Sequence, residues 1–280
     1  MIDLSIFSYE FMQKAFIVGT LLALIIPCIG MIIVLKRLSM IGDALSHSSL
    51  AGVATGLILG INPIIGAVVA CVIAALGIEG IRKKMPHYAE LSIAIIMSAG
   101  IGLAGVLSGF VQNAANFNSF LFGSIVAISD FELILVLTIS IIVLLTFILL
   151  YKELFFIAFD EQAAQLTGIP VKAINLIFTL MTAATISIAA RTVGALIVSS
   201  LMVVPVACAM QIGRSYKQTV FYAIAFALFF TWSGLFISYY ARLKPGGTIV
   251  LTGVVTLLLI LLVKKIASRF TLRKATADHS

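Results

Sequence analysis

The sequence predicts an all-α polytopic membrane protein with about eight or nine transmembrane helices. Hydrophobic residues make up 62% of the 280-residue chain, charged residues only 10%, and the mean hydropathy is +1.21. A soluble domain carries roughly 25% charged residues, so this chain has too few to cover a water-facing surface. Because little polar sequence is left for a second domain, we expect residues 1–280 to form a single transmembrane domain.

Apolar stretches of about 17–25 residues are candidate membrane spans. The sequence contains nine such stretches, which lie near residues 14–35, 42–60, 63–81, 91–111, 131–150, 173–190, 193–212, 219–240 and 247–263. The number falls to eight if one stretch, such as 193–212, is broken or re-entrant. The segment 116–130 is shorter and more polar, and its Phe, Gly and Ser content favours a re-entrant piece packed inside the protein.

The basic residues predict the orientation of these spans. Fourteen of the 18 Lys and Arg residues lie on one side of the predicted spans and four on the other. Because cytoplasmic loops are enriched in Lys and Arg, the side with fourteen is expected to be cytoplasmic. This orientation places the N-terminus outside the cell, and the loop 152–172 and the tail 264–280 in the cytoplasm.

Asp43 and His47 stand out because both lie inside a predicted apolar span. They are four residues apart, so a helix places them on one face, one turn apart. Counting a rise of about 1.5 Å per residue from Arg37, His47 lies about 15 Å deep, near the middle of a hydrocarbon core about 30 Å thick. A charged residue at such a depth costs at least about 2.5–3.5 kcal/mol, and it usually faces a cavity, a pathway or a partner.

Two interpretations of this pair stay open. A carboxylate oxygen and an imidazole nitrogen together suit a divalent Mn, Fe or Zn ion. A closed metal site usually needs about four ligands, which two copies of the chain would supply across a two-fold axis. Alternatively, Asp43 and His47 form a buried, hydrogen-bonded pair that holds helices together, since buried polar groups need partners.

The longest loop on the basic side, residues 152–172, contains a predicted short helix at 161–167. Asp160 is a suitable N-cap, Glu161 lies in the first turn, Gly168 can end the helix and Pro170 follows it. A short helix at the cytoplasmic face suits docking to a soluble partner, but it also suits an ordinary connection between two spans. The residues alone leave both interpretations open.

Two motifs connect the chain to a known family. Residues 39–47 have the sequence SMIGDALSH, and residues 159–168 have the sequence FDEQAAQLTG. Together with LFGSIVAIS at 121–129, VGALIVSSLMVVPVACAM at 193–210 and the PGG of 245–247, they resemble the permeases of zinc, manganese and iron ABC importers. The resemblance covers about residues 12–265. GDALSH is its specific element, and Ala51 is a departure, because many relatives have Pro at that position.

The resemblance implies an ABC importer permease architecture, with residues 1–280 as one permease domain that forms a homodimer. It also implies two cytoplasmic ABC ATPase subunits and an extracellular metal-binding protein that delivers the ion. On this basis Asp43 and His47 match the metal-coordinating positions within the membrane. The matching ATPase-coupling residues are Asp160, Glu161, Gln162, Gln165 and Gly168. Zinc and manganese members share the motif, so the choice among Mn²⁺, Zn²⁺ and Fe²⁺ stays open.

Other function classes are less consistent with the sequence. The chain contains no G-x-x-x-x-G-K-[ST] motif, so we expect ATP hydrolysis on a separate subunit and no enzymatic activity here. An intramembrane aspartyl protease needs two embedded aspartates, whereas only Asp43 lies well inside a span, and no H-E-x-x-H motif is present. A secondary, ion-coupled divalent metal transporter is the main alternative, although such carriers typically use several intramembrane acidic residues.

We therefore expect a subunit of an importer in the bacterial plasma membrane, with a transported metal and no permanently bound cofactor.

The orientation of the chain in the membrane can be tested with single cysteines. We expect a membrane-impermeant thiol reagent to label Ser5→Cys in intact cells and to label Ala275→Cys only after lysis, because the basic loops hold the C-terminal side in the cytoplasm. Preferential labelling at position 275 in intact cells would reverse the assignment.

Overall fold

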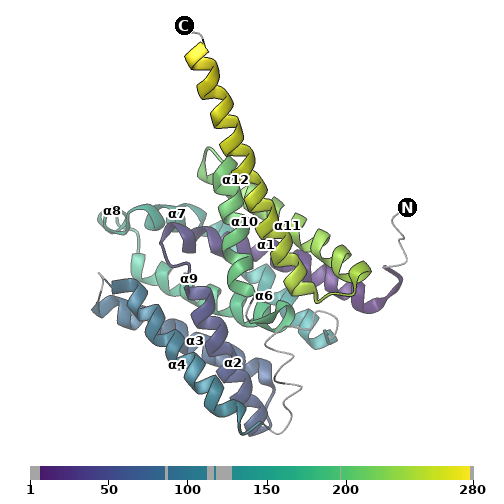
Figure 1. Ribbon diagram of the computed structural model, residues 1–280. Coiled ribbons are helices and arrows are strands. Elements are labelled where there is room, and N and C mark those ends of the chain that lie inside the picture. Colours follow the sequence, from purple (N-terminus) through teal and green to yellow (C-terminus); the bar gives the residue numbers. More distant parts are fainter. Residues whose placement is uncertain (1–6, 86–87, 112–116, 118–127, 196, 278–280) are drawn as a thin grey trace.

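The computed structural model describes residues 7–85, 88–111, 117, 128–195 and 197–277, and these residues form helices and no strand (Figure 1). The predicted all-α class is therefore confirmed. The segment 116–130, for which a re-entrant piece was expected, lies almost entirely outside the described residues.

The long helices follow the apolar stretches of the sequence. In the first half of the chain they are α1 (Glu10–Leu35), α2 (Ile41–Leu59), α3 (Pro63–Lys84) and α4 (Ala89–Ser108). In the second half they are α6 (Asp130–Leu149), α9 (Val171–Ala189), α10 (Val198–Ile212), α11 (Tyr216–Ala241) and α12 (Pro245–Ala277). Two short helices, α7 (Tyr151–Phe159) and α8 (Glu161–Leu166), connect α6 to α9.

Among the described residues, 7 helical segments are long and apolar enough to cross a membrane, slightly fewer than the eight or nine expected. The two predicted spans that do not qualify are α2 and α10. Helix α10 has only 15 residues because a π-helical turn, Ala190–Gly194, extends α9 and delays the start of α10 until Val198. The stretch 193–212 is thus broken, which is one of the possibilities that the sequence left open.

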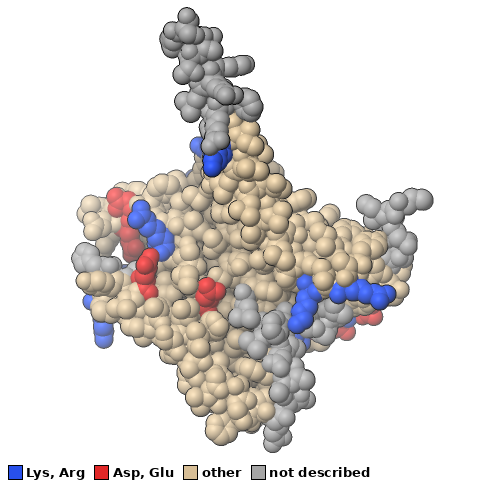
Figure 2. Space-filling view, viewed as in Figure 1, with Lys and Arg blue, Asp and Glu red and all other residues tan. Residues whose placement is uncertain are grey.

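Charged side chains pair at two opposite ends of the bundle. At one end Lys14 forms ion pairs with Glu10 and Asp130, and Arg191 contacts Glu132 at 2.8 Å. At the opposite end of the bundle, in the last turn of α3, Arg82 contacts Glu79 at 2.8 Å. Most of the surface seen in Figure 2 carries no charge, and Lys, Arg, Asp and Glu are few on that face. This distribution is the one expected for helices that cross hydrocarbon.

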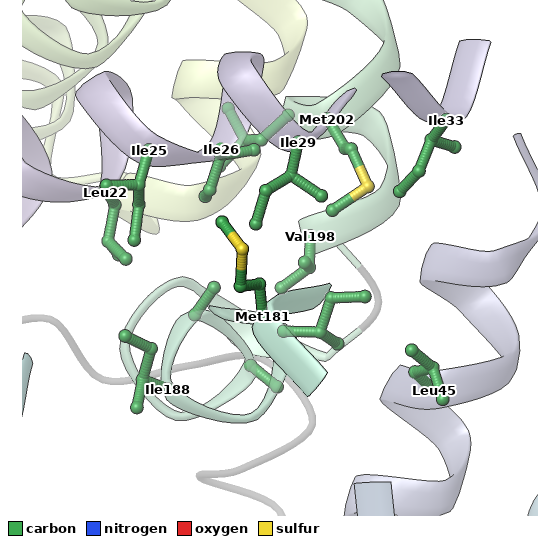
Figure 3. Close-up of a cluster of buried hydrophobic side chains, with 14 of the residues drawn as sticks. Leu22, Ile25, Ile26, Ile29, Ile33, Leu45, Met181, Ile188, Val198 and Met202 are labelled. Carbon is green, nitrogen blue, oxygen red and sulfur yellow. The ribbon is translucent and has the colours of Figure 1, made fainter. Parts of the chain in front are cut away.

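The core forms where α1 crosses α9 and α10 (Figure 3). Its side chains are almost all branched aliphatic residues or Met, which fill space without polar atoms. The buried residues from these helices and from α2 include Leu22, Ile25, Ile26, Ile29, Ile33, Leu45, Met181, Ile188, Val198 and Met202. Helix α1 packs also against α11 and α6, whereas α2 packs mainly against α3 and α4.

Helix α2 packs closely against α3 through glycines. A Cβ atom added to Gly52 would collide with the carbonyl oxygen of Gly66, and one added to Gly66 would collide with the carbonyl of Gly52. Such close approach of two backbones is typical of membrane helices, where dispersion contacts replace the hydrophobic effect as the source of association. The position of α2 is therefore fixed by backbone contact.

This contact predicts the effect of one methyl group. Gly52→Ala should lower the free energy of unfolding by about 1–2 kcal/mol, because overpacking costs about 1–3 kcal/mol and exceeds the gain of about 0.5–1 kcal/mol that Ala brings to a helix. Gly80→Ala in α3 is the control, because a Cβ there meets no atom within 4 Å. Thermal unfolding in detergent measures both, and equal stability of the two variants would contradict the close α2–α3 contact.

Candidate functional site

A short, hydrogen-bonded turn joins α1 to α2 and fixes the start of the candidate metal helix. Lys36 caps α1, and Arg37 has a φ of 58°, a left-handed conformation that reverses the chain. The backbone N–H of Leu38 donates to the carbonyl of Ile33 at 2.9 Å, and the N–H of Ile41 donates to the carbonyl of Leu38 at 2.9 Å. Because these bonds hold the turn to both helices, the first turn of α2 cannot move independently of the end of α1.

Asp43 and His47 lie on consecutive turns of α2, as the spacing predicts. Asp43 is in the first turn, where the N-terminal end of the helix dipole favours a carboxylate. Both side chains are half-buried, whereas the residues between them, Ala44, Leu45 and Ser46, are buried. The two side chains therefore lie on the face of α2 that this single chain does not fully cover.

Two neighbouring helices hold this part of α2 from the other sides. Gly100 of α4 packs against the backbone, and a Cβ added there would lie 2.9 Å from the Ser48 nitrogen and 3.2 Å from the carbonyl carbon of His47. Gly42 packs against the first turn of α10, with a Cβ position 3.2 Å from the Cα of Ser199. Asp43 and His47 thus project from a backbone that is fixed by close packing.

Neither the Asp43 carboxylate nor the His47 imidazole has a hydrogen bond or ion pair within the described part of the chain. The bonded Asp–His pair, which was the alternative interpretation, is thus not formed in the described single chain. The described residues also contain no group of three or more His, Cys, Asp or Glu that could hold a metal ion. One chain therefore brings one carboxylate and one imidazole to this point, half the number of ligands in a usual four-ligand metal site.

The short helix expected at 161–167 is present as α8 (Glu161–Leu166), whose role in ATPase coupling stays a prediction. The Asp160 carboxylate caps it by accepting from the Ala163 N–H at 2.8 Å, and Gly168 follows it with a φ of 86°. Gln162 and Gln165 are exposed, and Leu166 is 89% exposed. The loop also contains α7, which was not predicted and which is anchored by the buried side chains of Leu154 and Ile157.

A chain of hydrogen bonds near α8 also escaped the sequence analysis. The Lys36 ammonium donates to the Asn175 side-chain oxygen at 2.7 Å, and the Asn175 amide nitrogen donates to Glu161 at 3.0 Å. The pKa of Lys36 is lowered to about 8, mainly by burial and then by the charge of Arg82, while the carboxylates of Glu161 and Glu79 act in the opposite direction. The signal available in the sequence was Asn175 itself, a polar amide within the apolar helix α9, because a buried amide needs hydrogen-bond partners.

A second feature that was missed lies at the opposite end of the bundle. A hollow of about 520 Å³ is lined by the Arg191–Glu132 ion pair and by the α2–α3 turn around Asn62. Glu132 also accepts from the backbone N–H of Ser129 at 2.9 Å and so belongs to the N-terminal cap of α6. The ion pair joins the start of α6 to the π-helical turn after α9.

Comparison with known proteins agrees with this architecture. The model of the ABC 3 transport family matches residues 8–264 of the chain. The chain belongs to the ABC 3 transport family. This membership confirms the resemblance to metal ABC importer permeases and makes the chain a multi-pass membrane protein of a transport system.

Individual transport proteins are similar to this chain over most of its length. The manganese transport system membrane protein MntC of Listeria monocytogenes is 32% identical over 248 residues, which are 88% of each chain. The high-affinity zinc uptake system membrane protein ZnuB of Haemophilus influenzae is 31% identical over 244 residues, 87% of this chain and 94% of its own. The structure of PsaBC from Streptococcus pneumoniae in complex with Fab superposes with a TM-score of 0.82 at 28% identity, covering 91% and 92% of the two chains.

Proposed function

We propose that this ABC 3 family permease forms, as a homodimer, the membrane pathway of an ATP-driven importer of Mn²⁺ or Zn²⁺, with Fe²⁺ as a third candidate. The observation that carries the proposal is the pair Asp43 and His47, a carboxylate and an imidazole on one half-exposed helix face with no side-chain partner among the described residues. Two chains related by a two-fold axis would bring four such side chains to the pathway, the usual number for a closed transition-metal site.

The chemistry of the pair fits a divalent ion. A carboxylate supplies negative charge that offsets part of the charge of the ion, and an imidazole supplies a nitrogen of intermediate softness. An ion that leaves water for the membrane needs such fixed ligands, because its hydration is lost there. Oxygen and nitrogen donors accept both manganese and zinc, and relatives are named for each metal. We therefore propose that selectivity lies partly in the extracellular protein that delivers the ion.

The exposed face of α8 supports a separate ATPase subunit as the energy source. Leu166 is 89% exposed and Phe159, just before α8, is 65% exposed, so two large apolar side chains are exposed here together with the polar side chains of Gln162 and Gln165. An apolar centre with polar residues around it is the usual composition of a protein interface. Two ATPase subunits would dock here on the cytoplasmic side, and the end with Lys14 and Arg191 would face the delivery protein outside.

Reconstitution separates this mechanism from the ion-coupled alternative. We expect proteoliposomes that contain the dimer, its ATPase and its delivery protein to accumulate ⁵⁴Mn or ⁶⁵Zn only with ATP. A secondary transporter would instead accumulate the metal without the ATPase when a proton or sodium gradient is imposed, and that result would overturn the proposal.

The metal site is tested by two substitutions on α2. Asp43→Asn keeps the side-chain shape but removes the charge, and His47→Ala removes the nitrogen ligand. We expect each to reduce uptake at least about 100-fold per assembled complex, since loss of a metal-site group commonly costs about 10–100-fold even outside the ligand shell. Uptake is measured as radioactive metal per dimer that still binds the ATPase.

The control is Thr55→Val on the same helix, because the Thr55 hydroxyl bonds only the Ala51 carbonyl of its own helix, at 2.9 Å. It should transport normally. If Asp43 and His47 were purely structural, their variants would assemble poorly but transport normally per complex, and this outcome would exclude them as metal ligands.

The docking surface is tested by adding charge to α8. Gln162→Arg with Gln165→Arg should abolish ATPase binding in pull-down assays and uptake, because two cations flanking the exposed Leu166 leave no dry apolar contact. Helix α8 should stay folded, since the Asp160 cap is unchanged. As a control, Tyr88→Arg adds a charge to the exposed start of α4 and should preserve binding. Normal ATPase binding by the double variant would rule out α8 as the docking site.

A further inference from the structure

The hydrogen-bonded chain Glu161–Asn175–Lys36 connects the two candidate functional elements of the molecule. Glu161 belongs to α8, Asn175 to α9, and Lys36 caps α1 immediately before the turn that leads to α2. The donor–acceptor distances are 3.0 Å between Asn175 and Glu161 and 2.7 Å between Lys36 and Asn175. Asn175 is hydrogen-bonded to both of the other two, so it joins α8 to the end of α1.

The surroundings of the chain keep its members in place. Asn175 is 4% exposed, and Lys36 lies over the ring of Phe178 with its ammonium 5.8 Å from the ring centroid. A cavity of about 20 Å³, room for about one water molecule, is lined by Lys36, Asn175 and Ile41. Because Asn175 is buried and Lys36 is half-buried with so little free space beside them, the two side chains must move together or leave donors unpaired, which is unfavourable.

The connection continues rigidly to the candidate metal ligands. Leu38 is buried and hydrogen-bonded to α1, and Ile41, the first residue of α2, is hydrogen-bonded to Leu38. Asp43 follows two residues later in the same helical turn. Displacement of Glu161 therefore has a continuous path of hydrogen bonds and packed side chains to the first turn of α2.

We propose that Asn175 is a positioning residue that transmits movement of the ATPase-docking helix α8, through Lys36, to the metal-binding first turn of α2. The inference rests on the proposed function, namely ATPase docking at α8 and metal contact by Asp43 and His47. In this arrangement Asn175 is needed for coupling ATP hydrolysis to transport, but it belongs to neither surface.

The first test breaks each half of the connection. Asn175→Leu removes both hydrogen bonds, and Lys36→Met removes only the bond to Asn175 while the contact between Asn175 and Glu161 remains. In reconstituted complexes we expect both variants to bind the ATPase and to hydrolyse ATP within about twofold of the unaltered protein. The metal imported per ATP hydrolysed should fall at least about fivefold in both, the lower end of usual coupling between sites.

Two controls match the size and charge of these changes. Thr179→Val alters a side chain that lines the same cavity and has no hydrogen bond to any described residue. Lys83→Met removes a positive charge from the C-terminal end of α3. The Lys83 side chain is 57% exposed, and its ammonium lies 3.7 Å from Glu79. Both should leave the metal-to-ATP ratio unchanged.

The second test reverses the donor and acceptor. Asn175→Asp alone places two carboxylates in contact with each other and should lower the metal-to-ATP ratio. Adding Glu161→Gln restores a hydrogen bond, because the Gln amide donates to the new carboxylate, whose other oxygen still accepts from Lys36. The double variant has the same net charge as the unaltered chain, and we expect it to recover at least half of the original ratio. This rescue remains informative if Asn175→Leu does not assemble.

The outcomes separate this inference from the proposed function. If the unaltered complex binds neither ATPase nor metal, the proposed function fails and the connection fails with it. If the unaltered complex transports and the Lys36→Met variant keeps a normal metal-to-ATP ratio, Asn175 only anchors α8 and the inference is wrong. Failure of the reversed pair to recover the ratio would also overturn it.

Discussion

A charged side chain in hydrocarbon loses its hydration at a cost of at least about 2.5–3.5 kcal/mol, and this cost constrains every polar residue of the bundle. Lys14, Arg191 and Arg82 meet the constraint by forming ion pairs at the ends of the helices. Within the described residues, Asp43 and His47 do not pair in this way. Polar groups that stay half-buried and unpaired at the start of α2 require a further partner, and the function proposed for the protein follows from that requirement.

Backbone packing determines how precisely such groups can be placed. Lipid offers no hydrophobic driving force between helices, so close contact of small residues must hold them together. Gly66 on α3 and Gly100 on α4 both lie against the backbone of α2, and Ser199 of α10 lies against Gly42. Helix α2 is therefore held on three sides, and the open fourth side carries Asp43 and His47. A rigid helix with one uncovered polar face suits a site that a second copy completes.

At the end of the bundle with Lys36, a short helix with few buried side chains, α8, lies against the deeply packed helix α9. Helix α8 has six residues and few buried side chains of its own, so it depends on α7 and α9 for its position. The contact of Asn175 with Glu161 supplies part of that support. Because Asn175 also holds Lys36, the same amide takes part in two helix contacts. A short helix that is bonded to a deeply packed neighbour is a suitable place for a docked subunit to move a membrane domain.

The sequence by itself determined the all-α membrane class, the position of most helices, the short helix after Asp160 and the family, because apolar length, helix caps and the GDALSH motif are local properties. It also placed Asp43 and His47 on one helix face, since a spacing of four residues fixes their relation. It allowed for a break in 193–212 without locating it, and it did not reveal α7 or the partners of Lys36, Asn175, Glu132 and Arg191. Lys36 and Asn175 are 139 residues apart, and Arg191 and Glu132 are 59 apart, so no local pattern relates them. Only the packing of α1 against α9, and of α6 against the turn after α9, brings these side chains within hydrogen-bond distance, because tertiary contact is what excludes water and forces buried polar groups to find each other.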